Sequence, residues 1–247
     1  MNLLNNSVGT TFKGNISITS FDELQYLKVN GIASNAFNGC TSLKTIHLPD
    51  SCTNIGGSQG SINTYSFNGC TSLEYIYGAE NVKMVNGMAF SGCSKLKSIN
   101  LKNVETLWES PFEKCPSLIS IGDLSNITYL GYGSLRIPNI TSFNLSKKCK
   151  NIGNVCFFAD INLESVGDLS GVEQIGRGAF AYCTKLKYLK FIQTIPPSIG
   201  TDVFNGTTFN IYVQDTCIDT YKNATNWSAY ASRIKQMSTF TIDFPNG

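Results

Sequence analysis

The residues of this chain with the greatest capacity for chemistry are nine cysteines and a single histidine, His47. The cysteines stand at positions 40, 52, 70, 93, 115, 149, 156, 183 and 217. A structural zinc site requires cysteine and histidine ligands in close pairs, separated by about two to four residues, and this spacing contains none. A nucleophile needs a base and a group that orients the base, which one histidine does not supply. We therefore expect no metal site, no cofactor and no catalytic residue.

Five of the cysteines belong to a sequence motif, here called the phrase, that recurs along the chain. Its clearest copy is Ala-Phe-Ser-Gly-Cys at 89–93, followed by Leu96, Ile99 and Leu101. The phenylalanine position returns every 22–24 residues, after a first step of 30. Its occupants are Phe37, Phe67, Phe90, Phe112, Leu135, Phe157, Phe180 and Phe204. A step of about 20–29 residues with a Leu-x-x-Ile-x-Leu strand is typical of leucine-rich repeats, whose coils bury their apolar faces against their neighbours.

The phrase Ala-Phe-x-x-Cys-x-x-Leu resembles the BspA-like leucine-rich repeats over roughly residues 30–235. Its cysteine stands where other leucine-rich repeats carry asparagine. Spacing and resemblance together predict a right-handed α/β solenoid of about eight coils of 22–24 residues, with parallel strands on its concave face and a cap at each end. The resemblance also implies a cell-surface or secreted protein of a host-associated anaerobe or parasite, with adhesion as its usual role.

The repeat also predicts four segments. Residues 1–31 lack the phrase and are interpreted as an N-terminal cap, which the open end of a solenoid requires. Residues 32–200 hold the leucine-rich repeats, and residues 201–235 form a C-terminal capping repeat. Residues 236–247 form a tail that either extends this cap or begins a further domain.

The N-terminal cap contains signals for two short elements. Phe12, Ile16 and Ile18 predict an edge strand, and Ser20 with Glu23 forms a capping box that begins a helix. In the coils that follow, a hydrophobe five residues before each phenylalanine is expected to enter the core. These hydrophobes are Ile32, Ile62, Val85, Leu107, Leu130, Ile152, Ile175 and Ile199.

The C-terminal segments contain similar signals. Residues 217–223 are predicted to be helical, and Asn226 is expected to cap a second helix that runs to residue 234. Beyond it, Phe240, Ile242 and Phe244 alternate with polar residues, which predicts a half-buried strand.

Two departures from the regular phrase admit a functional interpretation. The long first step contains Gly-Gly-Ser-Gln-Gly-Ser at 56–61, which is either a tolerated insertion or a binding loop. In two coils the sequence Gly-Asp-Leu places Asp123 and Asp168 where the strand's last leucine would stand. We expect these strands to end early, with the carboxylate bonded to turn amides. A calcium site is the alternative, although calcium takes about six to eight oxygen ligands.

The cysteines at 40, 70, 93, 115 and 183 share one point of the repeat. We interpret them as a column of buried thiols that pack as small hydrophobes. The disulfide framework of a secreted protein favours an even number of cysteines, and nine is odd. Oxidation between neighbouring coils remains the alternative, because strands stacked about 4.8 Å apart lie within the Cα separation that a disulfide can bridge.

Composition excludes several partners. The formal net charge is +2, so no strong field attracts nucleic acid or an anionic membrane. No run of about 18 apolar residues occurs, which predicts no membrane insertion in this segment. The first residues lack the basic and apolar regions of a signal peptide. We expect a monomer.

Side chains alternate across a strand, so the residues before and after each central isoleucine should face outward on the concave side. These pairs are Thr45/His47, Tyr75/Tyr77, Ser98/Asn100, Ser120/Gly122, Ser142/Asn144, Ser165/Gly167 and Tyr188/Lys190. They contain no Asp or Glu, whereas glycoside hydrolysis needs paired carboxylates and metal-assisted cleavage needs grouped carboxylates or histidines. A polysaccharide-active enzyme is therefore the remotest of three functional classes.

The outward pairs predict a shallow binding face with small residues in its centre. The expected ligand contacts are His47, Tyr75, Tyr77, Tyr188 and Lys190. Tyrosine gives a large contact area at low entropic cost, so we predict a protein ligand, with a host extracellular-matrix protein as one candidate. A glycan is the alternative ligand, because sugars also stack on tyrosine rings. The interpretation without any ligand is that the tyrosines stiffen the sheet by same-face pairing.

Overall fold

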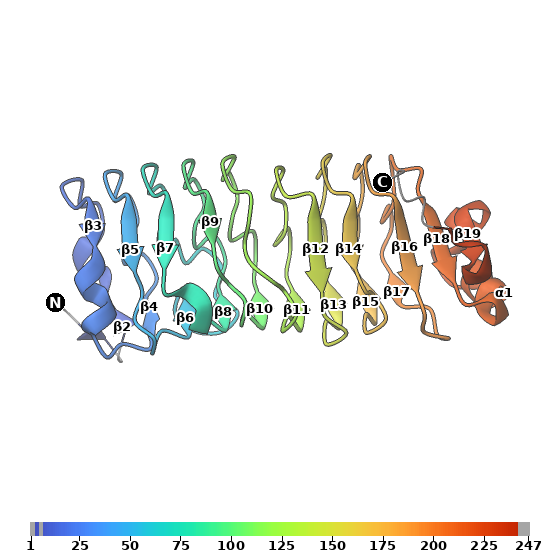
Figure 1. Ribbon diagram of the computed structural model, residues 1–247, viewed down its shortest axis with the longest axis horizontal. Coiled ribbons are helices and arrows are strands. Elements are labelled where there is room, and N and C mark those ends of the chain that lie inside the picture. The colour runs from blue at the N-terminus through green and yellow to red at the C-terminus, as the bar shows by residue number, and fades with distance from the viewer. Residues whose placement is uncertain (1–2, 5–6, 242–247) are drawn as a thin grey trace.

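The computed structural model describes residues 3–4 and 7–241. Their coils stand side by side in one row, from the N-terminal cap at one end to the helical C-terminal cap at the other (Figure 1). Parallel strand pairs between successive coils build sheets along the row. The buried side chains form one continuous core inside the coils. The chain is thus a solenoid, as its repeat predicts.

A ten-stranded sheet runs along the whole row. Its two-residue strands are β1 (Leu3–Leu4), β2 (Ser7–Val8), β4 (Gly31–Ile32), β6 (Asn54–Ile55), β8 (Met84–Val85), β10 (Thr106–Leu107), β11 (Tyr129–Leu130), β13 (Asn151–Ile152), β15 (Gln174–Ile175) and β17 (Ser198–Ile199). Among the described strands, only β1 and β2 pair in antiparallel fashion. This second strand of each coil was not predicted, because two residues are too short to give a periodic signal.

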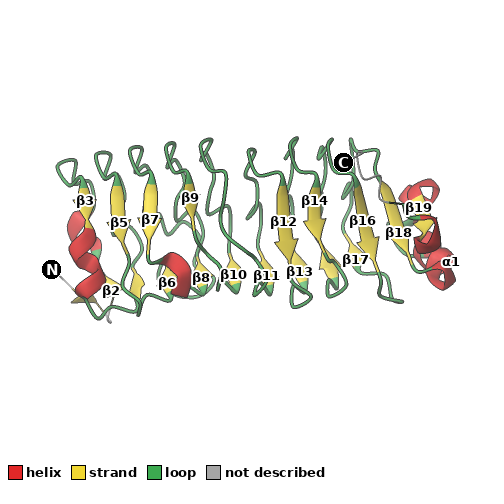
Figure 2. Cartoon of the chain, viewed as in Figure 1, coloured by secondary structure: helices red, strands yellow, loops and turns green. Residues whose placement is uncertain are grey.

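The expected Leu-x-x-Ile-x-Leu strands form a second wall, which we call the segmented sheet because it consists of three pieces (Figure 2). Its four-stranded piece contains β3 (Ser20–Phe21), β5 (Thr45–His47), β7 (Tyr75–Tyr77) and β9 (Ser98–Ile99). Its two-stranded piece contains β12 (Ser142–Leu145) and β14 (Ser165–Gly167). The last piece contains β16 (Tyr188–Phe191), β18 (Asn210–Val213) and β19 (Ile234–Gln236).

The segmented sheet is broken after the two coils that carry Gly-Asp-Leu. Gly122 and Gly167 have φ angles of +85° and +73°, in the left-handed region that turns the chain out of a strand. In the β7 coil the left-handed glycine, Gly78, comes one residue later, after the strand is complete. In the described part of the chain, no backbone hydrogen bond joins residues 118–124 to residues 140–146. The early strand end is therefore confirmed for the Gly122 coil, where only an isolated bridge at Ser120 remains, and it interrupts the sheet. It is not confirmed for the Gly167 coil, because β14 spans three residues, as β7 does.

The turn bonds predicted for the two aspartates are also present. Asp123 Oδ1 accepts a hydrogen bond from the amide two residues later at 3.1 Å, and Asp168 Oδ1 accepts the equivalent bond at 2.7 Å. Among the described residues, no group of three or more His, Cys, Asp or Glu side chains could hold a metal ion. The turn interpretation of these aspartates therefore accounts for their contacts.

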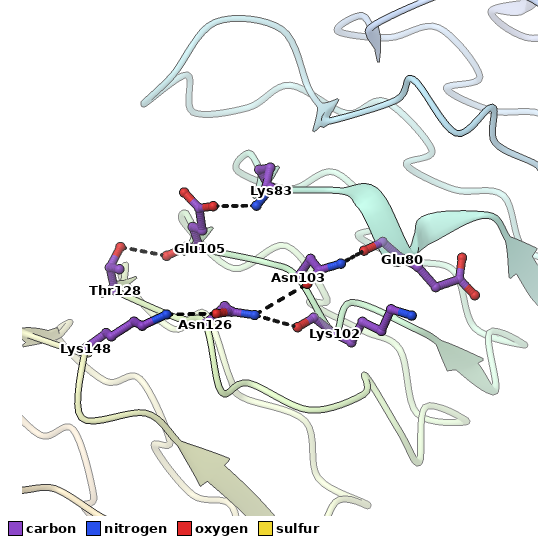
Figure 3. Close-up of polar contacts among 8 residues, drawn as sticks. All are labelled: Glu80, Lys83, Lys102, Asn103, Glu105, Asn126, Thr128 and Lys148. Atoms are coloured by element: carbon purple, nitrogen blue, oxygen red, sulfur yellow. Dashed lines mark hydrogen bonds and ion pairs between the residues drawn. The ribbon is translucent and has the colours of Figure 1, made fainter.

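Polar side chains in the turns between the two sheets link successive coils across the first break (Figure 3). Asn103 Nδ2 donates to the Glu80 carbonyl at 2.8 Å, and Asn126 Nδ2 donates to the Lys102 carbonyl at 3.3 Å. Lys148 Nζ, in the coil beyond the break, donates to Asn126 Oδ1 at 3.0 Å. The coils thus separate on the segmented sheet alone and stay joined at this turn and along the ten-stranded sheet.

A column of stacked phenylalanines fills the core, as predicted. Phe12 of the N-terminal cap extends it, with ring centroids 5.3 Å from those of Phe37. The further stacked pairs are Phe37–Phe67 at 5.1 Å, Phe67–Phe90 at 5.2 Å, Phe90–Phe112 at 5.6 Å, Phe157–Phe180 at 5.0 Å and Phe180–Phe204 at 6.1 Å. The column is interrupted only where Leu135 replaces the ring, at a fully buried position.

The nine cysteines are buried free thiols. The five in the column each donate a hydrogen bond to the carbonyl of the phenylalanine in the preceding turn of the solenoid. The Sγ–O distances are 2.9 Å for Cys40–Phe12, 3.1 Å for Cys70–Phe37, 3.1 Å for Cys93–Phe67, 3.1 Å for Cys115–Phe90 and 2.9 Å for Cys183–Phe157. Burial raises the pKa of Cys115 and Cys183 to about 12, which keeps these thiols protonated and unreactive.

The N-terminal cap differs from its prediction in two elements. Thr10–Phe12 is the 3₁₀-helix η1, and Ile16 is exposed rather than part of a strand. Asn15 Oδ1 accepts bonds from two following amides and so forms a turn. The capping box is wrong because Ser20 pairs with the first coil through β3, and the 3₁₀-helix η2 (Asp22–Tyr26) begins without a side-chain cap.

The first long step of the repeat was assigned incorrectly. Ile62 is 59% exposed, whereas Ile55 is buried in β6 and occupies the expected position in the ten-stranded sheet. The extra residues therefore lie between this strand and Phe67, and the loop at 56–61 is part of them. A third 3₁₀-helix, η3 (Ala79–Asn81), follows β7.

The C-terminal cap contains the α-helix α1 (Ile218–Asn223), preceded by η4 (Asp215–Cys217) and followed by η5 (Ser228–Arg233) and η6 (Met237–Thr239). Asn226 is not an N-cap: its φ is +65° and its Nδ2 donates to the Ile199 carbonyl at 2.7 Å. The strand predicted around Phe240 is also wrong at that residue, which follows η6 outside any strand, while Ile242 and Phe244 lie outside the described residues.

Candidate ligand-binding face

A trough of about 740 Å³ crosses the segmented sheet where the sheet is broken. Its lining residues are Gly122, Asp123, Ser142, Phe143, Asn144, Ser165, Val166, Gly167, Asp168, Tyr188, Lys190 and Ile192. Glycines and short polar side chains occupy the outward positions of three successive coils, so the floor lies low. The same left-handed glycines that interrupt the sheet thus also remove side chains from the floor. This trough is the centre of the binding face that the outward pairs predict.

One aromatic cluster stands at the C-terminal end of the trough. The Phe240 ring lies 4.6 Å from the Tyr188 ring and 4.8 Å from the Tyr212 ring, in edge-to-face contacts. Lys190 Nζ lies 3.4 Å from the centroid of Phe240 and 5.1 Å from that of Tyr188. Partial burial lowers the pKa of the Lys190 ammonium, although the ring faces attract its positive charge. Tyr188 and Lys190 are therefore together, as predicted.

Tyr212 and Phe240 belong to this cluster and were not predicted as site residues. Tyr212 occupies the outward position of β18, between two buried residues, so the same alternation that identified Tyr188 could have found it. Phe240 could not be found in this way. It reaches the cluster because the chain turns back after β19, which is a tertiary contact without a local signal.

A second cluster occupies strands β5 and β7. The rings of His47 and Tyr77 lie 5.9 Å apart, and those of Tyr75 and Tyr77 lie 6.3 Å apart. Lys97 Nζ lies 5.1 Å from the Tyr75 centroid and pairs with a Glu74 carboxylate oxygen at 2.6 Å. This ion pair lowers the pKa of Glu74. The structure thus brings His47, Tyr75 and Tyr77 together, and Tyr77 is the most exposed of the three.

The two clusters do not meet. The coils around Phe90, Phe112, Leu135 and Phe157 separate them, and only Tyr188 and Lys190 line the trough. With about 4.8 Å per coil, the clusters lie on the order of 24 Å apart. The face therefore offers two aromatic contact points joined by a polar floor, which suits an extended ligand rather than a small molecule.

Charge on this face is sparse and only partly paired, since no ion pair among the described residues includes Asp123 of the trough lining. Asp168, in the trough wall, lies 3.8 Å from Lys147 Nζ, and Lys190 lies against aromatic rings. Lys187 and Glu164, beside the trough, pair at 2.6 Å. Exposed pairs of this kind contribute little to stability. Besides the Asp123 carboxylate, they leave shape, hydroxyl and amide groups, and aromatic contacts as the means by which the face can recognise a ligand.

The stacked coils, the leucine-rich strand in each and the polar trough define a leucine-rich-repeat solenoid. The profile of the family described as BspA type leucine rich repeat region matches residues 8–59, 60–187 and 150–242. These matches cover most of the chain, and the chain belongs to this family. The resemblance inferred from the Ala-Phe-x-x-Cys phrase is thereby confirmed.

Three solved structures are similar to this chain. A leucine-rich repeat protein of T. pallidum shares 28% identity, with 65% of this chain and 72% of that chain covered and a TM-score of 0.54. A leucine rich cell surface protein of Faecalibacterium prausnitzii shares 17% identity, covering 76% and 71% with a TM-score of 0.36. A leucine-rich repeat protein of Bacteroides ovatus shares 20% identity, covering 94% and 87% with a TM-score of 0.33. No curated protein matches the sequence.

Among the described residues, no helix is both long and apolar enough to cross a membrane. The one α-helix that they contain, α1, has 6 residues.

Proposed function

We propose that this chain is a non-catalytic protein-binding module that holds an extended polypeptide segment along the segmented sheet. The observation that carries the proposal is the trough, about 740 Å³ in volume, with Tyr188 and Lys190 at its end and a second tyrosine cluster on the same face. Aromatic anchors at separated points give affinity, while a polar floor satisfies a peptide's amides. We place the module at the cell surface or outside the cell, acting as a monomer in adhesion, as BspA-like proteins usually do.

Burial of the thiols is compatible with this location. All nine are free, and the five of the column are hydrogen-bonded to main-chain carbonyls. A thiol reacts with oxidants as its thiolate, and burial disfavours that form in Cys52, Cys115 and Cys149. Reduced cysteines of this kind are protected in an oxidising environment as long as the chain stays folded.

The experiment is a binding assay of the full chain against immobilised collagen, fibronectin and laminin. We expect the double variant Tyr75→Ser with Tyr77→Ser to weaken binding about tenfold, a loss of roughly 1.4 kcal/mol. Ser165→Trp should weaken it as well by filling the trough floor. Tyr26→Ser is the matched control, because Tyr26 is 79% exposed in the N-terminal cap and far from the trough along the row.

Two results would overturn the proposal. One is binding that survives both the tyrosine double variant and Ser165→Trp, with unfolding temperatures unchanged. The other is the absence of binding to every matrix protein tested together with retention of oligosaccharides that the double variant loses, which would make this face a glycan site. Tyr26→Ser must bind like the unaltered chain for either result to count.

A further inference from the structure

A second groove lies on the ten-stranded sheet and shares no residue with the trough. A groove of about 510 Å³ follows strands β11, β13, β15 and β17. An adjoining hollow of about 430 Å³ shares Tyr132, Asn154 and Arg177 with it. We call the two together the outer groove. Its chemistry differs from that of the trough, because exposed aromatic rings and planar polar groups stand side by side in it.

The insertion loop is linked to the wall of the outer groove through Trp108. Tyr129, in the groove wall, packs against Trp108 with ring centroids 4.8 Å apart. Trp108 in turn lies against the loop, since a Cβ added at Gly60 would lie 3.4 Å from its ring. The loop therefore supports the groove wall through Trp108 without lining the groove itself.

The floor of the groove is main chain and is already paired. A Cβ on Gly176 would lie 2.3 Å from the amide nitrogen of Asn154, so glycine is required for the coils to approach this closely. The strands beneath pair on both sides, β13 with β11 and β15, and β15 with β17. A polypeptide cannot add itself beside β11, β13 or β15, because these interior strands have no free edge. The edge strand β17 is covered by the C-terminal cap, since Trp227 Nε1 donates to the Pro197 carbonyl at 2.8 Å and Asn226 Nδ2 donates to the Ile199 carbonyl at 2.7 Å. Any ligand must be recognised by side chains.

Two tyrosines that line the groove have exposed side chains. Tyr132 is 50% exposed and Tyr182 is 44% exposed. Tyr182 has a φ of +62°, at the position where three other coils place Gly39, Gly69 and Gly92 with positive φ. A bulky side chain is unfavourable in this conformation. Lys114 and Ala159 occupy the same point of their coils with a φ of +58°, so it is exposure and position in the groove, not this conformation, that make Tyr182 a candidate contact.

The charged side chains lining the groove cancel. They are Arg177 and Asp202, whose Nε and Oδ2 atoms lie 3.9 Å apart. Asn154 and Asn205 add amide groups, and Asn205 Nδ2 donates to the Tyr182 hydroxyl at 3.4 Å. The groove has no net charge with which to select a sulfated or sialylated ligand.

We infer that the outer groove binds a neutral oligosaccharide. The C–H faces of its sugar rings would stack on Tyr132 and Tyr182, and its hydroxyl groups would bond the carboxamide and guanidinium groups of Asn154 and Arg177. This site is independent of the proposed protein-binding face, which lies on the other sheet.

The test is an array of neutral, sialylated and sulfated oligosaccharides probed with the full chain, followed by titration of the retained sugars. Tyr132→Ser with Tyr182→Ser should weaken binding of neutral oligosaccharides about tenfold. Ser198→Trp should block binding without removing a proposed sugar contact, because Ser198 lies exposed in the groove floor. It removes one weak hydrogen bond, from the Ser198 hydroxyl to the Glu173 carbonyl at 3.4 Å. Binding of the unaltered chain should change little with ionic strength. Tyr26→Ser is again the matched control.

Three results would overturn the inference. They are the retention of no neutral oligosaccharide, the retention of acidic oligosaccharides alone with strong salt dependence, and the loss of sugar binding in Tyr75→Ser with Tyr77→Ser but not in the two outer-groove variants. The unfolding temperature of each variant is measured alongside. Since Ser198→Trp alters only an exposed position, the result stands even where the tyrosine double variant folds poorly.

Discussion

The coils from Phe37 to Phe112 and the coil around Leu135 fill the same core in different ways. In the first set, each ring stacks on the next and each column thiol donates to a carbonyl of the preceding turn. The coil around Leu135 lacks both the stacked ring and the thiol hydrogen bond. Leu135 replaces the phenylalanine, and Pro138, which is exposed, stands at the cysteine position. In the next coil Asp160 takes that position, only 2% exposed.

The difference shows which wall of the solenoid holds the array together. Beside Leu135 the segmented sheet is broken, whereas β10, β11 and β13 continue the ten-stranded sheet in unchanged register. The two-residue strands therefore fix the stacking of coils. The segmented sheet can locally lose strand pairing and have small outward side chains. The trough lies where both occur.

The largest expected effect comes from truncating the regular column. Phe90 is fully buried between two stacked rings, so Phe90→Ala should lower the free energy of unfolding by about 3–5 kcal/mol through the cavity it creates. Phe90→Leu should cost only about 1–1.5 kcal/mol, because Leu135 shows that the array accepts a leucine at this point. Urea denaturation measures both. Equal costs for the two variants would mean that the Leu135 coil has repacked in ways that a regular coil cannot.

Asp160 makes the irregular region sensitive to pH. Burial raises the pKa of its carboxyl to about 8, while the Ile137 backbone and the Arg136 guanidinium act in the opposite direction. Its Oδ2 has no hydrogen-bond partner among the described residues. The unfolded carboxyl titrates near its ordinary value of about 3.9. Between these two values the folded state therefore holds a proton that the unfolded state lacks.

Stability should consequently fall as the pH rises from about 5 to about 7, by about 1.4 kcal/mol per pH unit from this group. Urea denaturation at several pH values measures the slope, and Asp160→Asn should remove it. Cys156 and Cys183 also face the carboxyl, but they stay protonated over this range. Asp160→Cys, which restores the regular residue, should likewise abolish the slope. If the unaltered chain and Asp160→Asn show the same slope, the carboxyl is charged in the folded state.

The phenylalanine and cysteine columns could be predicted from the sequence because each needs one residue per coil at a fixed spacing. The strands carrying Tyr75 and Tyr188 followed from the same spacing, and with them the two candidate clusters. The ten-stranded sheet could not be predicted from two-residue strands. The shared position of Ile55 and Ile32 was hidden by the insertion that follows Ile55, and the contact of Phe240 with Tyr188 depends on how the chain returns after its last strand.

A substitution in the thiol column of the regular coils should have a smaller effect on stability. Cys93 Sγ donates to the Phe67 carbonyl at 3.1 Å, so a serine at this position keeps an acceptor within reach. Cys93→Ser should cost about 1 kcal/mol, because the shorter C–O bond lengthens the hydrogen bond and leaves some volume unfilled. Equilibrium unfolding in urea under reducing conditions measures it. A cost near that of Phe90→Ala would show that the hydroxyl is buried without its partner.

The smallest expected effect is a gain in stability. Ala159 and Lys114 both have φ of +58°, at the point where the regular coils carry Gly39, Gly69 and Gly92. The left-handed conformation costs an L-residue roughly 1–2 kcal/mol, and glycine loses about 0.5–1 kcal/mol through its greater freedom in the unfolded chain. Ala159→Gly should therefore stabilise the protein by about 0.5–1 kcal/mol in urea denaturation.

Lys114→Gly should give a similar gain in the regular half of the array, since the side chains of Lys114 and Ala159 are both exposed. Ile161→Gly is the matched control, because Ile161 is exposed but does not have a positive φ, so glycine there should only destabilise. A gain at Lys114 without one at Ala159 would mean that the coil beyond the break has relaxed its backbone. Losses at both positions would show that this turn does not need glycine.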